Sequence, residues 1–177
     1  MPNTKIKILQ QLLQQVIADY KKTNKIKAME FSERMKKLIE AYNNRHLDDF
    51  TAQVLDEVAK QLNDLLNDIK VDKEKFKELG ISFEEKAFYD ILASCAKKFH
   101  FENQYSDEKM KNLAKKVKAL VDDKTRYTDW DQRIDVKAEM EADLMILLDD
   151  NGYPPVPRNE VYNEVFEQAE NFKKYAE

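Results

Sequence analysis

The sequence has very little glycine, proline and cysteine, and each shortage removes a class of protein. Its 177 residues include two glycines, four prolines and one cysteine. Sheet-rich folds need many tight turns, which glycine and proline usually form, so this composition argues against them. The single Cys95 leaves no disulfide framework and no cysteine metal cluster. Gly80 and Gly152 stand far apart, which excludes the glycine-rich loops that bind ATP or dinucleotides.

Long hydrophobic runs are also missing. No apolar stretch approaches the roughly 18 residues needed to span a membrane, and residues 1–22 lack the uninterrupted apolar core of a signal peptide. Apolar residues make up 42% of the chain and charged residues 36%, as in a globular protein with a highly charged surface. We therefore expect a cytoplasmic protein with no membrane partner.

The net charge of −4 is unevenly spread. Residues 1–46 carry 10 Lys and Arg against 4 Asp and Glu, whereas residues 47–177 carry 20 against 30. The acidic excess is largest after Thr128, where 5 basic residues face 13 acidic ones. Because proteins bind nucleic acid through positive potential, the last third of the chain is a poor DNA surface.

Apolar residues recur at helical spacing along nearly the whole chain, and no strand pattern extends over more than a few residues. This predicts an all-α fold, an irregular helical bundle of seven or eight helices with no sheet. Residues 1–47 are predicted to form an N-terminal helical pair, and residues 48–177 a C-terminal helical domain. A third helix is expected to end near Ile69, followed by a charged connector over residues 71–80. Ser82 with Glu85 predicts a capping box, and Ser106 predicts a second helix start.

Residues 125–157 contain the longest helical pattern, which predicts a central core helix. Thr128 is the expected N-cap, Gly152 the expected left-handed residue after the last turn, and the prolines that follow prevent continuation. The apolar stripe of this helix consists of Trp130, Ile134, Ala138, Met145 and Leu148, flanked by Val136, Met140, Leu144 and Leu147.

Residues with catalytic potential are few. Neither His46 nor His100 has a glutamate three residues before it, so the Glu-x-x-His signature of a di-iron bundle is missing. We interpret His46 as a solvated residue at a helix end, His100 as a packed residue of an aromatic loop, and Cys95 as a small core residue. No cofactor or metal site is predicted in these 177 residues.

Acidic-x-Lys triplets, of the kind that metal-dependent nucleases use, start at Glu84, Asp107, Asp122 and Asp135. The nuclease use requires the triplet on a strand, so that the carboxylates and the lysine converge on one face. Each match here falls on or beside an expected helix. We therefore interpret the triplets as background in a charged chain and assign no catalytic residue.

One helix is rich in lysine, which leaves two interpretations. Such a run is usually a solvated helix face, but it can also contact the phosphate backbone without reading sequence. The candidate phosphate contacts are Lys109, Lys111, Lys115, Lys116 and Lys118.

Aromatic residues beside arginine and proline mark both ends of the central helix. They can anchor a partner surface, or they can fix the helix ends against neighbouring helices. The candidate partner interface comprises Arg126, Tyr127, Trp130, Arg133, Tyr153, Pro154 and Pro155.

Four segments together resemble one known family. FSERMKKLIEAYNNR (31–45), ISFEEKAFYDIL (81–92), DWDQRIDVKAEM (129–140) and NGYPP (151–155) are similar to the C-terminal helical region of the R subunit (HsdR) of type I restriction enzymes. The resemblance covers about residues 5–175 and keeps the order of the segments in the family. The helical pair of residues 1–47 is similar to the segment that follows the motor domains in that family, which implies that it connects to them.

The resemblance implies a functional context. In that family the R subunit joins an endonuclease domain and an ATP- and Mg²⁺-dependent DNA translocase to this helical region. It assembles with methyltransferase and specificity subunits, and the whole complex binds duplex DNA and cleaves unmethylated foreign DNA. These residues contain no nuclease or helicase motif, so no catalytic residue is carried over from the family. The role that the resemblance implies for this helical region is docking the motor subunit onto the methyltransferase core. The alternative is an accessory DNA-binding domain of the same machine that does not read sequence.

Overall fold

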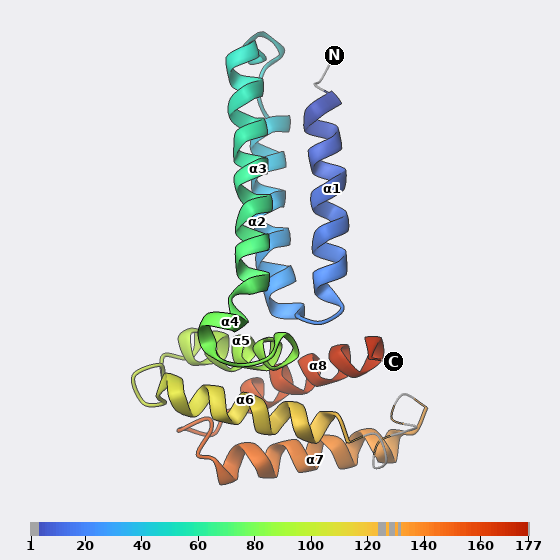
Figure 1. Ribbon diagram of the computed structural model, residues 1–177, viewed down its shortest axis with the longest axis vertical. Helices are drawn as coiled ribbons and strands as arrows, with labels where there is room; N and C mark the ends of the chain where they lie inside the picture. The colour runs from blue at the N-terminus through green and yellow to red at the C-terminus, as the bar shows by residue number, and fades with distance from the viewer. Residues whose placement is uncertain (1–3, 124–126, 128–129, 131, 177) are drawn as a thin grey trace. The chain divides into compact units, whose positions relative to one another are not determined.

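The computed structural model describes residues 4–123, 127, 130 and 132–176, and the regular structure in this part of the chain is helical (Figure 1). The helices are α1 (Thr4–Lys21), α2 (Lys25–Asn43), η1 (Leu47–Asp49, 3-10), α3 (Ala52–Glu74), α4 (Phe76–Leu79), α5 (Phe83–Lys98), α6 (Asp107–Val121), α7 (Ile134–Asp150) and α8 (Asn159–Tyr175). Among the described residues, seven α-helices have at least 15 residues, α4 is a single turn, and no strand is present. The predicted all-α class with seven or eight helices is therefore confirmed. Within the described ranges, no helix has the length and hydrophobicity that crossing a membrane requires.

Two helix starts follow the local sequence signals. The Ser82 hydroxyl accepts a hydrogen bond from the amide of Glu85 (3.0 Å), and the Glu85 carboxylate accepts one from the amide of Ser82 (2.8 Å). The Ser106 hydroxyl accepts one from the amide of Lys109 (3.2 Å). These three bonds satisfy amides that a helix leaves without an internal partner, so the predicted capping box and the predicted cap are confirmed.

The end of α3 differs from the prediction. The helix continues to Glu74, so the first residues of the expected charged connector are helical. Asp72 is buried in this added turn and accepts a hydrogen bond from the hydroxyl of Tyr20 (2.6 Å). This contact joins residues 52 positions apart and favours helix where the local sequence predicted a connector.

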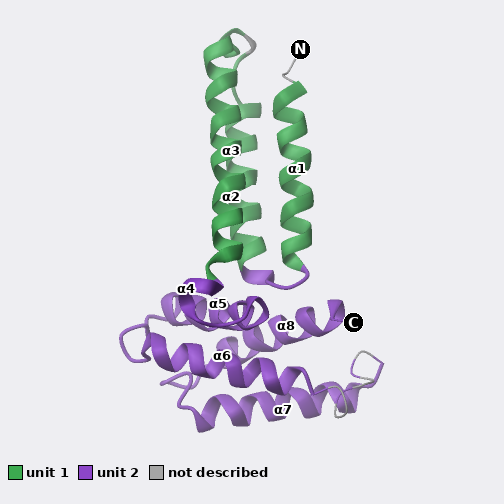
Figure 2. Cartoon of the chain, viewed as in Figure 1, with its two compact units in different colours: residues 1–21, 27–75 green, residues 22–26, 76–177 purple. Residues whose placement is uncertain are grey.

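The chain divides into two compact units, which Figure 2 colours separately. Residues 1–21 and 27–75 form unit 1, and residues 22–26 and 76–177 form unit 2. In unit 1, α1 packs against α3, and Arg34 of α2 forms an ion pair with Asp68 of α3 (2.7 Å). The predicted boundary lies at residue 47, whereas these units place α3 with α1 and α2. The role of residues 1–47 as a connection to motor domains stays a prediction.

Unit 2 contains the larger core. Helix α5 packs against α6 and α8, and α7 packs against α6 and α8. Its centre includes Phe88, Leu92, Leu113, Ala114, Val117, Met140, Leu144, Leu148, Val161, Val165 and Ala169.

The turn between α1 and α2, residues 22–26, is held within unit 2 by polar contacts. The Asn24 amide donates to the Asp90 carboxylate (2.8 Å), which also pairs with Lys86 (2.5 Å). The side chain of Gln168 donates to the carbonyl of Thr23 (2.8 Å) and accepts from the amide of Lys25 (3.1 Å). Backbone groups of the turn are therefore satisfied by a buried side chain of α8.

The start of the central helix also differs from the prediction. Helix α7 begins at Ile134, after the half-buried Trp130, and the predicted N-cap Thr128 lies outside the described residues. The C-terminal prediction is confirmed, because Gly152 has a φ of 69°. The amide of Tyr153 donates to the carbonyl of Leu148 (2.9 Å), and that of Gly152 to Asp149 (3.0 Å), the Schellman pattern.

The side of α7 that is buried differs from the side at the centre of the predicted apolar stripe. Met140, Leu144 and Leu148 are fully buried, and Val136 and Leu147 are half-buried. The other predicted members, Ile134, Ala138 and Met145, are exposed. Because α7 is apolar on both sides, its sequence did not determine which side would face the core.

Candidate interaction surface

The two tyrosines of the predicted partner interface lie in the core of unit 2. The Tyr153 hydroxyl donates to the carbonyl of Leu92 (2.8 Å), and its ring contacts Phe101 and Tyr105 edge-on, with ring centroids 5.4 and 5.3 Å apart. Burial raises the pKa of the Tyr153 hydroxyl far above its usual range. The Tyr127 hydroxyl donates to Asp143 of α7. Since neither ring is exposed, both tyrosines fit the alternative in which aromatic residues fix the helix ends.

The remaining members of the predicted interface are only partly available to a partner. Arg126 lies outside the described residues, Pro154 is buried and Pro155 is half-buried. Trp130 packs against the core of unit 2 with part of its surface exposed. Arg133 is exposed and forms two hydrogen bonds to Asp135 (2.6 and 3.2 Å). These bonds hold the pKa of the Asp135 carboxyl below its usual range.

Four of the five candidate phosphate contacts on α6 already have partners within unit 2. Lys111 pairs with Asp107 (3.3 Å), Lys118 pairs with Asp122, Lys116 donates to the side chain of Asn151 (2.9 Å), and Lys109 lies 5.9 Å from the ring centre of Tyr105. Each of these contacts is a single ion pair, hydrogen bond or cation–π contact within unit 2. Lys115 is exposed. Carboxylates therefore offset part of the positive charge of α6, and its contact with phosphate stays a prediction.

The Cys95 thiol is a core group, as predicted. It is fully buried and donates to one carboxylate oxygen of Glu164 (3.0 Å), while Lys98 binds the other oxygen (2.6 Å). Burial, with the adjacent carboxylate, raises the pKa of the Cys95 thiol well above its usual range. A protonated, buried thiol is a poor nucleophile. Glu164 carries no sequence signal as the partner of Cys95, because it is 69 residues away along the chain.

The two histidines are exposed, and for His100 this corrects the prediction of a packed residue. His100 has a φ of 61°. The amide of Phe101 donates to the carbonyl of Ala96 (2.8 Å), and that of His100 to Lys97 (3.4 Å). His100 therefore ends α5 in the left-handed position, as Gly152 does for α7. Among the described residues, no group of three His, Cys, Asp or Glu side chains is placed to hold a metal ion.

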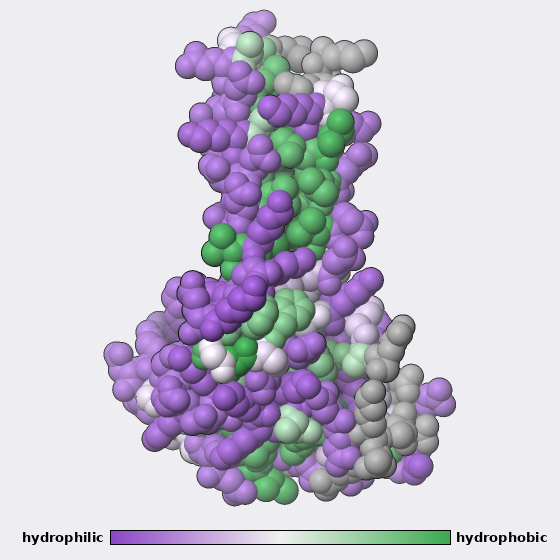
Figure 3. All heavy atoms as spheres, in the orientation of Figure 1, coloured by the Kyte–Doolittle hydropathy of each residue, from purple (hydrophilic) through white to green (hydrophobic). Residues whose placement is uncertain are grey.

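Helix α7 exposes hydrophobic side chains on the side away from its buried residues. Ile134 is 89% exposed, Ile146 58% and Met145 38%. Hydrophobic residues are visible over α7 at the lower edge of unit 2 in Figure 3. The exposure of Ile134 and Met145 corrects the prediction that places them in the core, and Ile146 is not part of the predicted stripe.

These features define a class of protein: an all-α domain whose polar and reactive side chains hold its helices together, and whose surface includes an exposed apolar helix face. The family model described as "Type I restriction enzyme HindI endonuclease subunit-like, C-terminal" matches residues 1–175. The chain belongs to this family.

Two relatives show the same relationship. The chain is 29% identical over 151 residues to a putative type I restriction enzyme MjaIXP endonuclease subunit of Methanocaldococcus jannaschii. It is 28% identical over 148 residues to the type I restriction enzyme HindI endonuclease subunit of Haemophilus influenzae. Each match covers 84% of this chain and 13% of the relative, so the chain spans only a small part of these subunits. No solved structure matches the chain.

Proposed function

We propose that this chain is the C-terminal interaction domain of a type I restriction endonuclease subunit. In this proposal it docks the nuclease and translocase part of that subunit onto the complex of methyltransferase and specificity subunits. Duplex DNA is then bound by the whole complex in the cytoplasm, and ATP and Mg²⁺ are used by the rest of the endonuclease subunit. Membership of the family supports this context.

The observation that carries the proposal is the set of contacts that the reactive side chains of unit 2 make with other residues of the unit. Cys95 and Lys98 both bind Glu164, and Lys86 pairs with Asp90 in the core. Each of these groups would need an open, convergent arrangement to bind or transform a substrate. Here Glu164 joins α8 to α5, and Asp90 holds the turn of residues 22–26 through Asn24. These structural roles favour a domain that acts through its surface.

The proposal can be tested with the 177-residue chain and the purified methyltransferase–specificity complex of the same restriction system. We expect the chain to bind this complex and to compete with the endonuclease subunit for it. A chain that does not bind the complex would refute the proposal. If the chain instead retards duplex DNA at low salt and releases it steeply as salt rises, the accessory DNA-binding alternative is supported.

A further inference from the structure

Helix α7 is apolar on two opposite sides. Met140, Leu144 and Leu148 face the core of unit 2 and are fully buried. On the opposite side, residues spaced three and four apart share one face of the helix. We call these residues the α7 face: Ile134, Ala138, Ala142, Met145 and Ile146, all of which are exposed.

An exposed face of this composition is unusual for a surface helix. A helix that is hydrophobic on all sides is normally buried, because each apolar side chain gains from leaving water. The described residues of unit 2 cover one side of α7, through α6 and α8. The α7 face therefore has the properties of a surface that another molecule covers.

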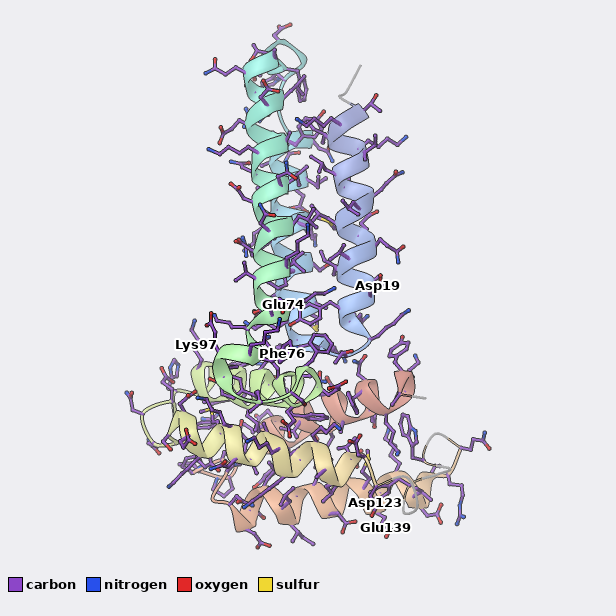
Figure 4. All side chains as sticks on the ribbon, in the orientation of Figure 1. Asp19, Glu74, Phe76, Lys97, Asp123 and Glu139 are labelled. Carbon is purple, nitrogen blue, oxygen red and sulfur yellow. The ribbon has the colours of Figure 1, made fainter. Side chains whose placement is uncertain are left out.

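Acidic residues border the α7 face. Glu139 and Asp150 are exposed, and Glu139 is labelled on α7 at the lower edge of unit 2 in Figure 4. Asp149 and Asp150 occupy the last turn of α7, where no basic residue is present. Negative charge at a helix C-terminus is unfavourable because it adds to the negative end of the helix dipole. Lys137, the one basic residue of α7, is bound to Glu170 of α8 (2.6 Å).

We propose that the α7 face binds an apolar groove, rimmed by Lys or Arg, on a protein subunit of the methyltransferase–specificity complex. This inference rests on the proposed function and adds the surface and the chemistry of its partner. The acidic border of the α7 face favours a partner whose groove has a basic rim, and it disfavours other molecules that could cover this face. Duplex DNA and anionic lipid would be repelled, and a second copy would bring two acidic borders together.

The experiment compares two matched pairs of substitutions in the 177-residue chain. The test variant is Ile134→Gln with Ile146→Gln on α7, and the control is Ile8→Gln with Leu12→Gln on α1. Ile8 is 58% exposed and Leu12 44%, so both variants remove two exposed aliphatic side chains. Thermal unfolding followed by circular dichroism checks that both variants fold like the wild type.

The readout is the affinity of each protein for the purified methyltransferase–specificity complex at several salt concentrations. We expect the α7 variant to bind at least about tenfold more weakly, and the α1 control to bind within about twofold of the wild type. We also expect Asp150→Lys to weaken binding and to reduce its dependence on salt. This substitution places a positive charge at the helix C-terminus, which favours folding, so unfolding would not explain the loss.

The outcomes separate the two proposals. If the wild type binds and the α7 variant binds equally well, the α7 face is not the docking surface, while the proposed function stands. If Asp150→Lys strengthens binding, the partner does not have a basic rim and the inference is wrong in its chemistry. If the wild-type chain does not bind the complex, the proposed function fails and the inference fails with it.

Discussion

The ion pair between Lys86 and Asp90 allows a quantitative test of how unit 2 is held together. Lys86 is 1% exposed and Asp90 8%, and the ammonium nitrogen lies 2.5 Å from the carboxylate. The same carboxylate oxygen accepts a hydrogen bond from the Asn24 amide (2.8 Å). Two opposite charges and one amide therefore meet in the core, beneath the turn of residues 22–26.

Removing one charge should cost more free energy than removing both. Lys86→Met leaves the Asp90 carboxylate buried without its positive partner, and we expect it to lower the free energy of unfolding by about 3–5 kcal/mol. In the double variant Lys86→Met with Asp90→Asn, both groups are neutral, and the new amide oxygen can still accept from Asn24. We expect this variant to lie within about 1–2 kcal/mol of the wild type.

The assay is urea unfolding at neutral pH of the wild type, the two single variants and the double variant. Fluorescence of Trp130, the single tryptophan, reports on unit 2, because its side chain packs against that core. Linear extrapolation gives the four free energies of unfolding, and the double-mutant cycle gives the coupling. The reasoning is refuted if the double variant is less stable than either single variant, since the two charges would then contribute independently.

Two further predictions concern ionisable groups. The hydrogen bond from the Tyr89 hydroxyl lowers the pKa of the Asp107 carboxyl in the folded protein. The charged carboxylate should therefore stabilise the fold above the pKa of an aspartate in the unfolded chain, about 4. This stabilisation should be lost as pH falls through the lower folded pKa. Urea unfolding at pH 7 and pH 3 should show a larger deficit for Asp107→Asn at pH 7 than at pH 3; an equal deficit at both would contradict the assignment. Burial and Glu164 raise the pKa of the Cys95 thiol. Iodoacetamide at pH 8 should therefore label Cys95 in the urea-unfolded protein and not in the native protein. Rapid labelling of the native protein would contradict the burial of this thiol.

The sequence predicted those parts of the fold that depend on neighbouring residues. Ser82, Ser106 and Gly152 act within one helical turn, so their caps could be recognised from spacing alone. The end of α3 could not, because it depends on the bond between Tyr20 and Asp72, which are far apart in sequence. For the same reason, the buried partner Glu164 of Cys95 had no sequence signal.

The candidate surface was predicted less well than the fold. Aromatic residues at the helix ends suggested partner anchors, but Tyr127 and Tyr153 are fully buried. Ile134 and Met145 of α7 were instead assigned to the core, since periodicity identifies an apolar side without saying what covers it. A sequence signal was present in the acidic last turn of α7, which breaks the expected charge pattern of a helix C-terminus.

Tyrosine–carboxylate bonds explain why α7 can present an apolar face at all. The Tyr127 hydroxyl donates to Asp143 and the Tyr162 hydroxyl donates to Asp149, so two acidic residues of α7 are bound within unit 2. Burial and the bond to Asp149 raise the pKa of Tyr162 to about 12, so the hydroxyl remains a donor at neutral pH. These bonds fix the rotation of α7 about its axis and thereby the direction of the α7 face. A substitution at Tyr127 that weakens docking would consequently report a change in the orientation of α7, because Tyr127 itself is not exposed to a partner.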